Sequence, residues 1–506
     1  MNMGYILENA VQQFGEKTAI ILDDQTLSFS QLNELANRVG NGLKEMGVQR
    51  GDRVSLLLPN SVESISSFFA IMKIGAVINP LNPLFKGREI KYILNHSEAR
   101  VLLTTRDKMP AIEELRGELS YLEHVVLVDA DSYPHTQSFR ELRDKGSPRL
   151  ALEPCNDDRP MFLVYTSGTT GLPKGATVTH RNCLANSQLG AQALFYTKWD
   201  LIITALPVFH LFGGNVVLHA SVIAGATLCV LSRFEPRSMI EKIDAIRANV
   251  LVGVPTMFVY LNRAVQPGEG QSLERAITGG APMALEVMRE FERKFNAPLI
   301  ELYGLTEGAG IITCNPLYYP AKPGSVGLVL PPVQLKLVDP ETGEKEVPVG
   351  QIGELCARGP VVMKEYWRMP QETAQAIRDG WLYTGDLAQM DEEGFVYLKG
   401  RKKEMLIVGG YNVYPVEIED VLYEHPAVAE AAVVGVADEK MGELPKAFIV
   451  LRAGESVSPE EITAFCEARL ARYKVPRQVE FISEIPKNPV GKILKRVLKE
   501  REIQSR

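Results

Sequence analysis

Short apolar runs alternate with helix-like stretches along the N-terminal half of the chain, and this alternation constrains the fold more than any other feature. Residues 53–58 (RVSLLL) and 76–79 (AVIN) are strand-like, whereas residues 31–46 and 64–74 have apolar positions at helical spacing. Strands that alternate with helices are typical of a mainly parallel sheet covered by helices.

The same rhythm returns downstream in a second set of strand-like runs, at residues 201–205, 227–231, 250–253 and 299–302. From residue 324 to 398 the strands become shorter and are separated by Gly and Pro, which favours a β-rich subdomain. We therefore expect an α/β fold, with two doubly wound α/β subdomains and a β-rich subdomain in one large N-terminal domain.

A charge cluster, Arg401-Lys402-Lys403-Glu404, follows the β-rich stretch. A charged, exposed link between apolar segments is a place where few contacts should cross, so we predict the domain boundary there. The expected domains are residues 1–400 and residues 401–506. The second is a small α/β domain, which we call the cap.

The composition excludes several classes of protein. The 506 residues are 45% hydrophobic and 23% charged, which predicts a soluble globular protein with a sizeable core. The net charge of -7 disfavours a nucleic-acid partner.

Three further features bear on location. Residues 201–232 carry no charged side chain, but Pro207 and Gly213-Gly214 interrupt them, so we expect a strand, a turn, a helix and a strand instead of a membrane span. We expect no secretory signal at the N-terminus. The nearest pair of cysteines, Cys155 and Cys183, lies 28 positions apart, which predicts scattered buried thiols in a reducing cytoplasm.

The densest group of hydrogen-bond donors lies in residues 165–175 (YTSGTTGLPKG), which follow a strand-like run at 161–164. Glycines allow close backbone approach, so that amide N–H groups can converge on an anion, and the hydroxyls and Lys174 add donors. This composition predicts a phosphate-binding loop, with a plain hairpin turn as the alternative. It is not a Walker A loop, because a strand-like run at 176–179 stands where that motif would begin a helix.

The loop resembles the phosphate-binding signature of the acyl-adenylate-forming superfamily, which comprises acyl-CoA synthetases, firefly-type luciferases and the adenylation domains of peptide synthetases. Similar motifs follow in order along nearly the whole chain, at residues 207–213 (PVFHLFG), 303–307 (YGLTE), 383–387 (YTGDL), 400–404 (GRKKE) and 486–492 (PKNPVGK). Within the superfamily the sequence looks closest to bacterial fatty-acyl-CoA ligases.

The resemblance implies a reaction in two steps. A carboxylate attacks the α-phosphate of ATP to give acyl-AMP and pyrophosphate, and the thiol of coenzyme A then displaces AMP. ATP, Mg²⁺ and coenzyme A are the cofactors implied.

Four catalytic residues are implied by the same resemblance. Lys492 would be the cation at the α-phosphate, Thr306 would contact that phosphate, Glu307 would bind Mg²⁺, and His210 would gate the junction of acyl pocket and thiol tunnel. Taken without the resemblance, Lys492 fits a solvated basic tail, Glu307 a solvated strand end and His210 a satisfied core histidine.

The resemblance also implies a nucleotide site. Tyr303 would stack on adenine opposite the backbone at Gly280, and Asp386 would accept both ribose hydroxyls. Glu301 stands where some relatives carry Asn, and a simple turn is the alternative role for Gly385-Asp386. The full set implied is Thr166, Ser167, Gly168, Thr169, Thr170, Gly171, Lys174, Gly280, Ala281, Pro282, Glu301, Tyr303, Gly304, Asp386 and Arg401.

One face of the cap cannot serve both half-reactions, so a hinge is expected, and the resemblance places it at Lys403. Rotation of the mobile cap would replace Lys492 with Gly409 and Gly410. The absence of side chains at these glycines would admit the pantetheine arm of coenzyme A, although turn formation alone could also account for them.

The acyl pocket is expected near residues 252–256 and 308–312, which are apolar and small. This favours a medium- or long-chain fatty acid as substrate. An aryl acid of the cinnamate or benzoate type is the alternative, and so is loading of a carrier protein in place of coenzyme A. The expected partners are therefore small molecules, while peripheral membrane contact stays open, as does the choice between monomer and homodimer.

Overall fold

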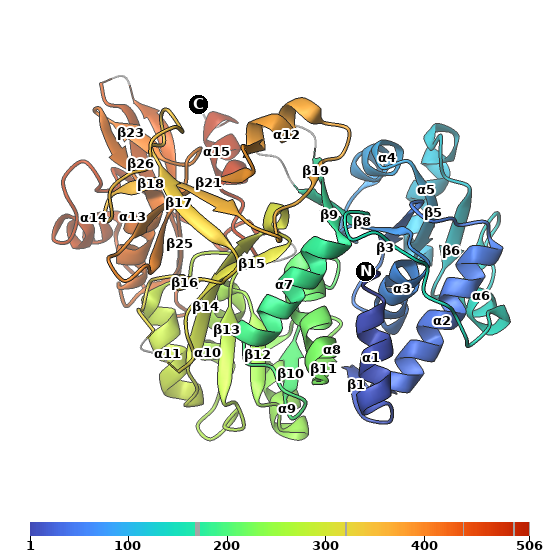
Figure 1. Ribbon diagram of the computed structural model, residues 1–506. Helices are drawn as coiled ribbons and strands as arrows, with labels where there is room; N and C mark the ends of the chain where they lie inside the picture. The colour runs from blue at the N-terminus through green and yellow to red at the C-terminus, as the bar shows by residue number, and fades with distance from the viewer. Residues whose placement is uncertain (167–172, 319–320, 439, 489–490, 505–506) are drawn as a thin grey trace.

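The computed structural model describes residues 1–166, 173–318, 321–438, 440–488 and 491–504. Its large N-terminal part holds two α/β units that lie next to each other, and the cap packs at one end of it (Figure 1). The fold class expected from the sequence, with two α/β units, a β-rich unit and a small α/β cap, is confirmed.

The first α/β unit is built on an eight-stranded sheet of order β19-β9-β8-β4-β3-β5-β6-β7. Its strands are β3 (Arg53–Leu57), β4 (Val77–Pro80), β5 (Ala99–Thr104), β6 (His124–Leu127), β7 (Gln137–Ser138), β8 (Pro160–Thr166), β9 (Lys174–Thr179) and β19 (Glu365–Tyr366). Strands β3 to β8 pair in parallel, whereas β9 and β19 run antiparallel to their neighbours.

The second unit is built on a nine-stranded sheet of order β16-β15-β14-β13-β12-β10-β11-β1-β2. Its strands are β1 (Thr18–Leu22), β2 (Gln25–Ser28), β10 (Leu201–Thr204), β11 (Thr227–Val230), β12 (Val250–Gly253), β13 (Arg275–Thr278), β14 (Leu299–Leu305), β15 (Gly310–Cys314) and β16 (Leu328–Val329). The sheet therefore takes two strands, β1 and β2, from the start of the chain, and β1 pairs in parallel with β11.

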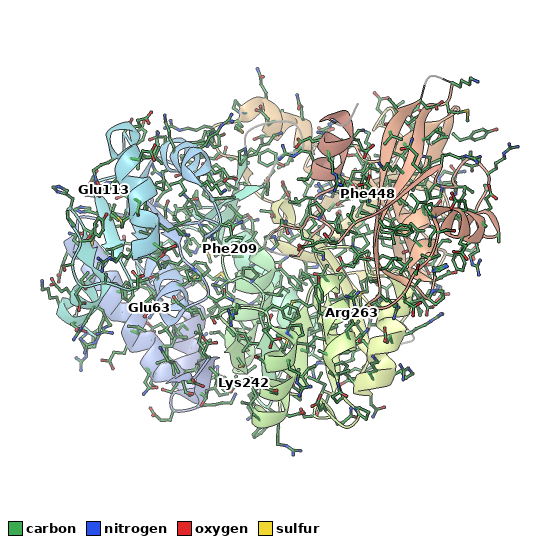
Figure 2. The ribbon with its side chains drawn as sticks, turned by 180° about the vertical axis from the view of Figure 1, so that it is seen from behind. Glu63, Glu113, Phe209, Lys242, Arg263 and Phe448 are labelled. Carbon is green, nitrogen blue, oxygen red and sulfur yellow. The ribbon has the colours of Figure 1, made fainter. Side chains whose placement is uncertain are left out.

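Helices cover both sheets. They are α1 (Tyr5–Phe14), α2 (Phe29–Glu45), α3 (Val62–Lys73), α4 (Gly87–His96), α5 (Met109–Leu115), α6 (Phe139–Lys145), α7 (His180–Ala193), α8 (Ala220–Ala224), α9 (Pro236–Ile246), α10 (Pro255–Ala264), α11 (Leu285–Phe295) and α12 (Pro370–Ala376). Helices α1, α3, α7 and α8 lie between the two sheets (Figure 1), where their apolar faces join one continuous core. Viewed from behind, Phe209 lies near the middle of the molecule (Figure 2).

The uncharged stretch 201–232 forms the elements expected of it. It contains β10, a turn, the π-helix Phe212–His219, helix α8 and β11. None of the helices within the described residues combines the length and the apolar character that a bilayer crossing needs.

The β-rich unit and the cap follow in sequence. The β-rich sheet consists of β17 (Gln334–Val338), β18 (Ile352–Arg358), β20 (Ile377–Arg378), β21 (Trp381–Met390) and β22 (Val396–Arg401). The cap contains β23 (Leu406–Val408), β24 (Tyr411–Val413), α13 (Pro415–Tyr423), β25 (Val428–Asp438), β26 (Gly442–Leu451), α14 (Pro459–Glu467), β27 (Gln478–Phe481) and α15 (Lys495–Gln504). Its buried residues, Phe448 in Figure 2 among them, form apolar clusters separate from the core of the large part.

Gly304 lets β14 and β15 pair closely beside the predicted nucleotide site. The antiparallel register of the two strands shifts between Tyr303 and Gly304. A Cβ atom placed on Gly304 would lie 1.6 Å from the carbonyl oxygen of Gly310, closer than any real contact allows. Only glycine therefore permits this strand pairing.

We expect Gly304→Ala to lower the free energy of unfolding by at least about 2 kcal/mol, because the two backbones must separate to admit the methyl group. Gly87→Ala in α4 is the matched control, since its added Cβ would lie 3.7 Å from the nearest atom, a side-chain carbon of Leu115. Urea unfolding of both variants measures the difference. Equal stability of the two would contradict the close approach described for Gly304.

Candidate active site

A buried carboxylate organises the predicted nucleotide site. The Tyr303 hydroxyl donates to Oδ2 of Asp386 at 2.7 Å, and Nε of Arg401 lies 3.0 Å from Oδ1 of the same residue. Asp386 on β21 and Arg401 on β22 face each other in register. Burial raises the pKa of Tyr303 and the adjacent Asp386 raises it further, so the phenol stays a hydrogen-bond donor.

The predicted phosphate-binding loop lies at the end of the hairpin formed by β8 and β9. Thr166 pairs with Lys174 in register, and its hydroxyl donates to the Lys174 carbonyl at 3.4 Å. Nζ of Lys174 lies 5.2 Å from the centre of the Tyr366 ring. The other loop residues predicted to bind phosphate, Ser167, Gly168, Thr169, Thr170 and Gly171, lie outside the described residues.

Thr306 and Glu307 form a short 3₁₀ turn, Thr306–Gly308, directly after β14. The Tyr366 hydroxyl donates to Oε1 of Glu307 at 2.7 Å, and the Glu307 carbonyl accepts from the Met363 backbone at 2.8 Å. The structure thus places both residues at the carboxyl end of a parallel strand, as the sequence predicted.

Four of the predicted residues line one small cavity of about 30 Å³. The complete lining is His210, Leu211, Phe212, Val216, Gly280, Leu302, Gly304, Leu305, Thr306 and Gly310. Ala281 and Pro282 follow Gly280 in a loop of which Ala281 is half-buried and Pro282 exposed. The cavity is lined by apolar side chains apart from His210 and Thr306.

His210 is half-buried and takes part in a local turn, where its Nδ1 accepts from the Phe212 backbone at 3.2 Å. Burial, and then the charge of Lys492, lower its pKa to about 4. His210 is therefore neutral at physiological pH. Its turn contact agrees with a structural role, and its position on the cavity agrees with the predicted gate.

Lys492 reaches this site from the cap. Burial lowers the pKa of Lys492 and the charge of Arg401 lowers it further, while Asp386 and Glu404 act in the opposite direction. The interpretation of Lys492 as part of a solvated tail is therefore wrong, because the side chain is half-buried among the predicted nucleotide-binding residues.

Helix α10 of the large part contacts the cap next to Lys492. A Cβ atom on Gly491 would lie 2.5 Å from Oγ1 of Thr256, so the Gly491 backbone lies close against the Thr256 side chain. One helical turn further on, the Tyr260 hydroxyl donates to Oε1 of Glu430 at 3.1 Å and accepts from Lys487 at 3.3 Å. Lys487 and Glu430 also form an ion pair of 2.5 Å. No motif in the sequence pointed to Tyr260, because its partners lie far away along the chain.

The charge cluster at the expected joint is less exposed than predicted. Lys402 forms an ion pair of 2.9 Å with Glu354, and Arg401 pairs with Asp386, so carboxylates of the β-rich sheet neutralise both cations. Strand β22 ends at Arg401, and Lys403 two residues later is exposed.

Gly409 and Gly410 lie away from the cavity. They form the exposed turn between β23 and β24, with φ angles of +58° and +86° that favour glycine. The structure brings Lys492 to the nucleotide site and leaves these two glycines outside it.

Glu301 lies two residues before Tyr303 on β14 and is 4% exposed. Its Oε2 atom has no hydrogen-bond partner within the described part of the chain. Burial raises the pKa of this carboxyl to about 8, against the effect of the Met283 backbone amide. Glu301 is therefore mostly protonated near neutral pH, and a protonated carboxyl offers an O–H donor beside a carbonyl acceptor, as the side-chain amide of Asn offers N–H donors beside its carbonyl.

The residues of this site are suited to bind a magnesium ion together with the phosphates of a nucleotide. Among the described residues no group of three or more His, Cys, Asp or Glu side chains could hold a metal ion. Magnesium in nucleotide sites is usually bound by one or two carboxylates together with substrate phosphates. A single carboxylate at Glu307, which like Lys174 contacts Tyr366, agrees with that arrangement.

Comparison with known proteins gives family matches along the chain. A family model described as AMP-binding enzyme matches residues 7–367, and one described as AMP-binding enzyme C-terminal domain matches residues 417–492. A long-chain-fatty-acid–CoA ligase of Bacillus subtilis (strain 168) is 34% identical over 530 aligned positions, which cover 99% of this chain and 94% of that protein.

Solved structures are similar over the whole length. The anthranilate CoA ligase AuaEII in complex with anthranoyl-AMP has a TM-score of 0.94 at 32% identity, covering 100% of this chain and 98% of the other. ATP-bound MatB from Rhodopseudomonas palustris has a TM-score of 0.92 at 32% identity, covering 99% of both chains. The apo form of MatB, also 32% identical, has a TM-score of 0.82 and covers 99% of this chain and 98% of the other. The arrangement of this chain is thus nearer to the ATP-bound form.

We expect Glu301→Gln to change how stability depends on pH. The unfolded chain releases this proton near pH 4.5, whereas the folded chain keeps it to about pH 8. Between these values the folded state binds the extra proton, so the wild-type free energy of unfolding falls as pH rises. The advantage of the variant over the wild type should grow by up to about 1.4 kcal/mol per pH unit.

Urea unfolding at about pH 5 and about pH 8 measures this difference, at the two ends of the window set by the raised pKa of Glu301. Glu392→Gln, at an exposed glutamate, is the control and should show no such trend. A stability difference that stays constant with pH would rule out the buried, protonated state of Glu301.

Proposed function

This chain belongs to the AMP-binding enzyme family, in which it is an AMP-forming acyl-CoA synthetase, and from that premise we propose that its acid is a medium- or long-chain fatty acid. The observation that carries the proposal is the meeting of Lys492, the Asp386–Arg401 pair and Thr306 beside an apolar cavity. The name of the Bacillus subtilis relative supports the fatty acid.

The cavity lining supports a monocarboxylic acid. No Lys or Arg is among the described residues that line it, so the second carboxylate of a dicarboxylic acid would find no cation among them. Its volume of about 30 Å³ is far below the roughly 300–1,000 Å³ of pockets that bury a ligand, so the site must widen to admit an acyl chain. An aryl acid is the second candidate, because AuaEII is named an anthranilate CoA ligase.

In the first half-reaction, the acid's carboxylate attacks the α-phosphate and pyrophosphate leaves. Negative charge grows on the α-phosphoryl oxygens, and Lys492 and Thr306 are the donors that would stabilise it. The lowered pKa of Lys492 rises again once phosphate is bound, because an adjacent anion favours the ammonium form. Tyr303 would hold adenine and Asp386 the ribose.

Mg²⁺, when bound, would neutralise charge on the phosphates of ATP. Glu307 is the carboxylate that would hold it, and Lys174 would place a second cation at the phosphates. Thr166 and its neighbours in the phosphate-binding loop would add hydrogen-bond donors.

In the second half-reaction, the thiolate of coenzyme A attacks the acyl carbon and AMP leaves. The thiol needs a path to the face that Lys492 covers, so we propose that the cap, residues 401–506, turns about Lys403 relative to residues 1–400. Gly409 and Gly410 would then face the site. The exposed side chains of Ile407 and Tyr411 next to them support a surface that is covered in another orientation of the cap.

A cytoplasmic location and a monomeric or homodimeric state are part of the same proposal. The scattered cysteines, of which Cys155 alone is partly exposed, support a reducing compartment.

An acid panel tests the substrate. We expect pyrophosphate release, measured with hydroxylamine present to convert acyl-AMP to the hydroxamate and AMP, to have a kcat/KM for octanoate or palmitate at least about tenfold above that for cinnamate, benzoate or butyrate. The same assay with coenzyme A or with a phosphopantetheinyl carrier protein identifies the thiol. A preference for cinnamate or benzoate would overturn the fatty-acid proposal and leave the ligase chemistry standing.

Two variants should separate the half-reactions. Lys492→Ala should lower pyrophosphate formation by about 100- to 1,000-fold, because the α-phosphate loses its cation, yet retain thioester formation from supplied acyl-AMP. Gly410→Leu should do roughly the opposite. Quenched single-turnover assays of each half-reaction measure these effects. If each folded variant lost both half-reactions equally, the assignment of Lys492 to the first half-reaction and Gly410 to the second would be refuted.

A further inference from the structure

One tyrosine outside the predicted site contacts two of its charged residues. The Tyr366 hydroxyl donates to Oε1 of Glu307 at 2.7 Å, and the face of its ring lies 5.2 Å from Nζ of Lys174. The same side chain therefore fixes one oxygen of the Glu307 carboxylate and supports the lysine of the phosphate-binding loop.

The segment around Tyr366 is tied to both of these elements by backbone hydrogen bonds. Strand β19 pairs with β9, with Tyr366 opposite Ala176, and the Trp367 backbone donates to the Gly175 carbonyl at 2.7 Å. The Met363 backbone donates to the Glu307 carbonyl at 2.8 Å. Tyr366 is thus held in register with the start of β9 and close to the turn that carries Glu307.

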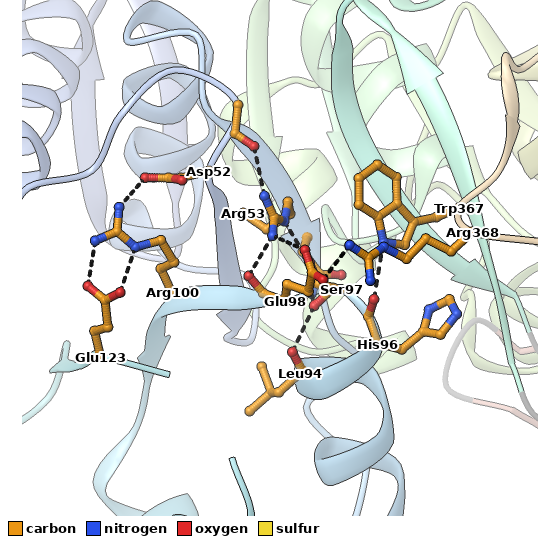
Figure 3. A network of polar contacts seen from close by, with 12 residues as sticks. Asp52, Arg53, Leu94, His96, Ser97, Glu98, Arg100, Glu123, Trp367 and Arg368 are labelled. Carbon is orange, nitrogen blue, oxygen red and sulfur yellow. Dashed lines mark hydrogen bonds and ion pairs between the residues drawn. The ribbon is translucent and has the colours of Figure 1, made fainter. Parts of the chain in front are cut away.

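The far side of the segment is anchored to the first α/β unit. Nε1 of Trp367 donates to the His96 carbonyl at 3.1 Å, and Arg368 forms an ion pair of 2.5 Å with Glu98 (Figure 3). The Arg53 guanidinium lies 5.7 Å from the centre of the Trp367 ring. These contacts leave Tyr366 little freedom to turn away from Glu307.

We propose that Tyr366 is a positioning residue that holds the Glu307 carboxylate so that its second oxygen is aimed at a divalent cation bound to the nucleotide. The inference rests on the proposed role of Glu307. A hydroxyl donor is suited to this task because it satisfies one oxygen without bringing a positive charge that would compete with the cation.

Tyr366→Phe in the full chain tests the proposal. Removing such an outer contact to a metal-binding carboxylate typically weakens metal affinity by 10- to 100-fold, and we expect a shift of about that size in the Mg²⁺ concentration needed for half-maximal pyrophosphate formation. Thioester formation from supplied acyl-AMP should change by less than about twofold, since pyrophosphate and its cation have left by then.

Binding of Mn²⁺ in the presence of ATP, followed by electron paramagnetic resonance, gives a readout that needs no turnover. The variant should bind Mn²⁺ about 10-fold or more weakly, while its affinity for ATP without metal stays unchanged. If the wild type makes no pyrophosphate with any acid, the proposed function fails, whereas this binding assay still decides the role of Tyr366. Unchanged Mn²⁺ binding would overturn the proposal.

Two further variants complete the test. Tyr397→Phe is the matched control, because its hydroxyl donates to Asp391, a carboxylate outside the site, at 3.4 Å. It should leave the dependence on Mg²⁺ unchanged. In a Glu307→Gln background, Tyr366→Phe should add less than about a twofold loss of Mn²⁺ affinity, because the residue it positions is already altered. A full additive loss in that background would show that Tyr366 does not act through Glu307.

Discussion

The carboxylate of Asp386 is the interaction on which the arrangement of the site depends. It is 7% exposed and accepts from Tyr303 on β14 and from Arg401 on β22, so it joins the second α/β sheet to the β-rich sheet. A buried carboxylate is costly unless it is paired and hydrogen-bonded, and here both oxygens have partners. Arg401 is the last residue of β22, so the same pair fixes the point at which the chain leaves the sheet for the cap.

Polar groups take part in the docking of the cap. Tyr260, Glu430 and Lys487 form one cluster, and the Gly491 backbone meets Thr256 beside it. The apolar clusters of the cap are separate from the core of the large part, so movement of the cap would not open either core. Small polar contacts between parts with their own cores are typical of domains that move relative to each other.

Local apolar patterns allowed much of the fold to be predicted from the sequence. The runs at 201–205 and 250–253 became β10 and β12, because a buried strand requires a run of apolar residues wherever it pairs. The membership of β1 and β2 in the second sheet was not predictable in this way. The residues of a strand do not identify its partner strand when that partner lies far along the chain.

The site shows the same limit. The resemblance pointed to Tyr303, Asp386 and Arg401, but their mutual hydrogen bonds appear only when three strands are placed together. Tyr366 carries no signal of its role, since its partners Glu307 and Lys174 come from other elements. The protonated state of Glu301 follows from burial, which a single sequence does not reveal.

The crossing of β1 into the second sheet has a consequence for synthesis of the chain. Ile20 pairs in parallel with Leu228 on β11. Strand β1 therefore gains this partner only after more than half of the large part has been synthesised. Until then, both edges of the β1–β2 ribbon stay open, and unpaired edges invite association with other chains. The two α/β units therefore form one folding unit that cannot be separated by a cut in the sequence between them.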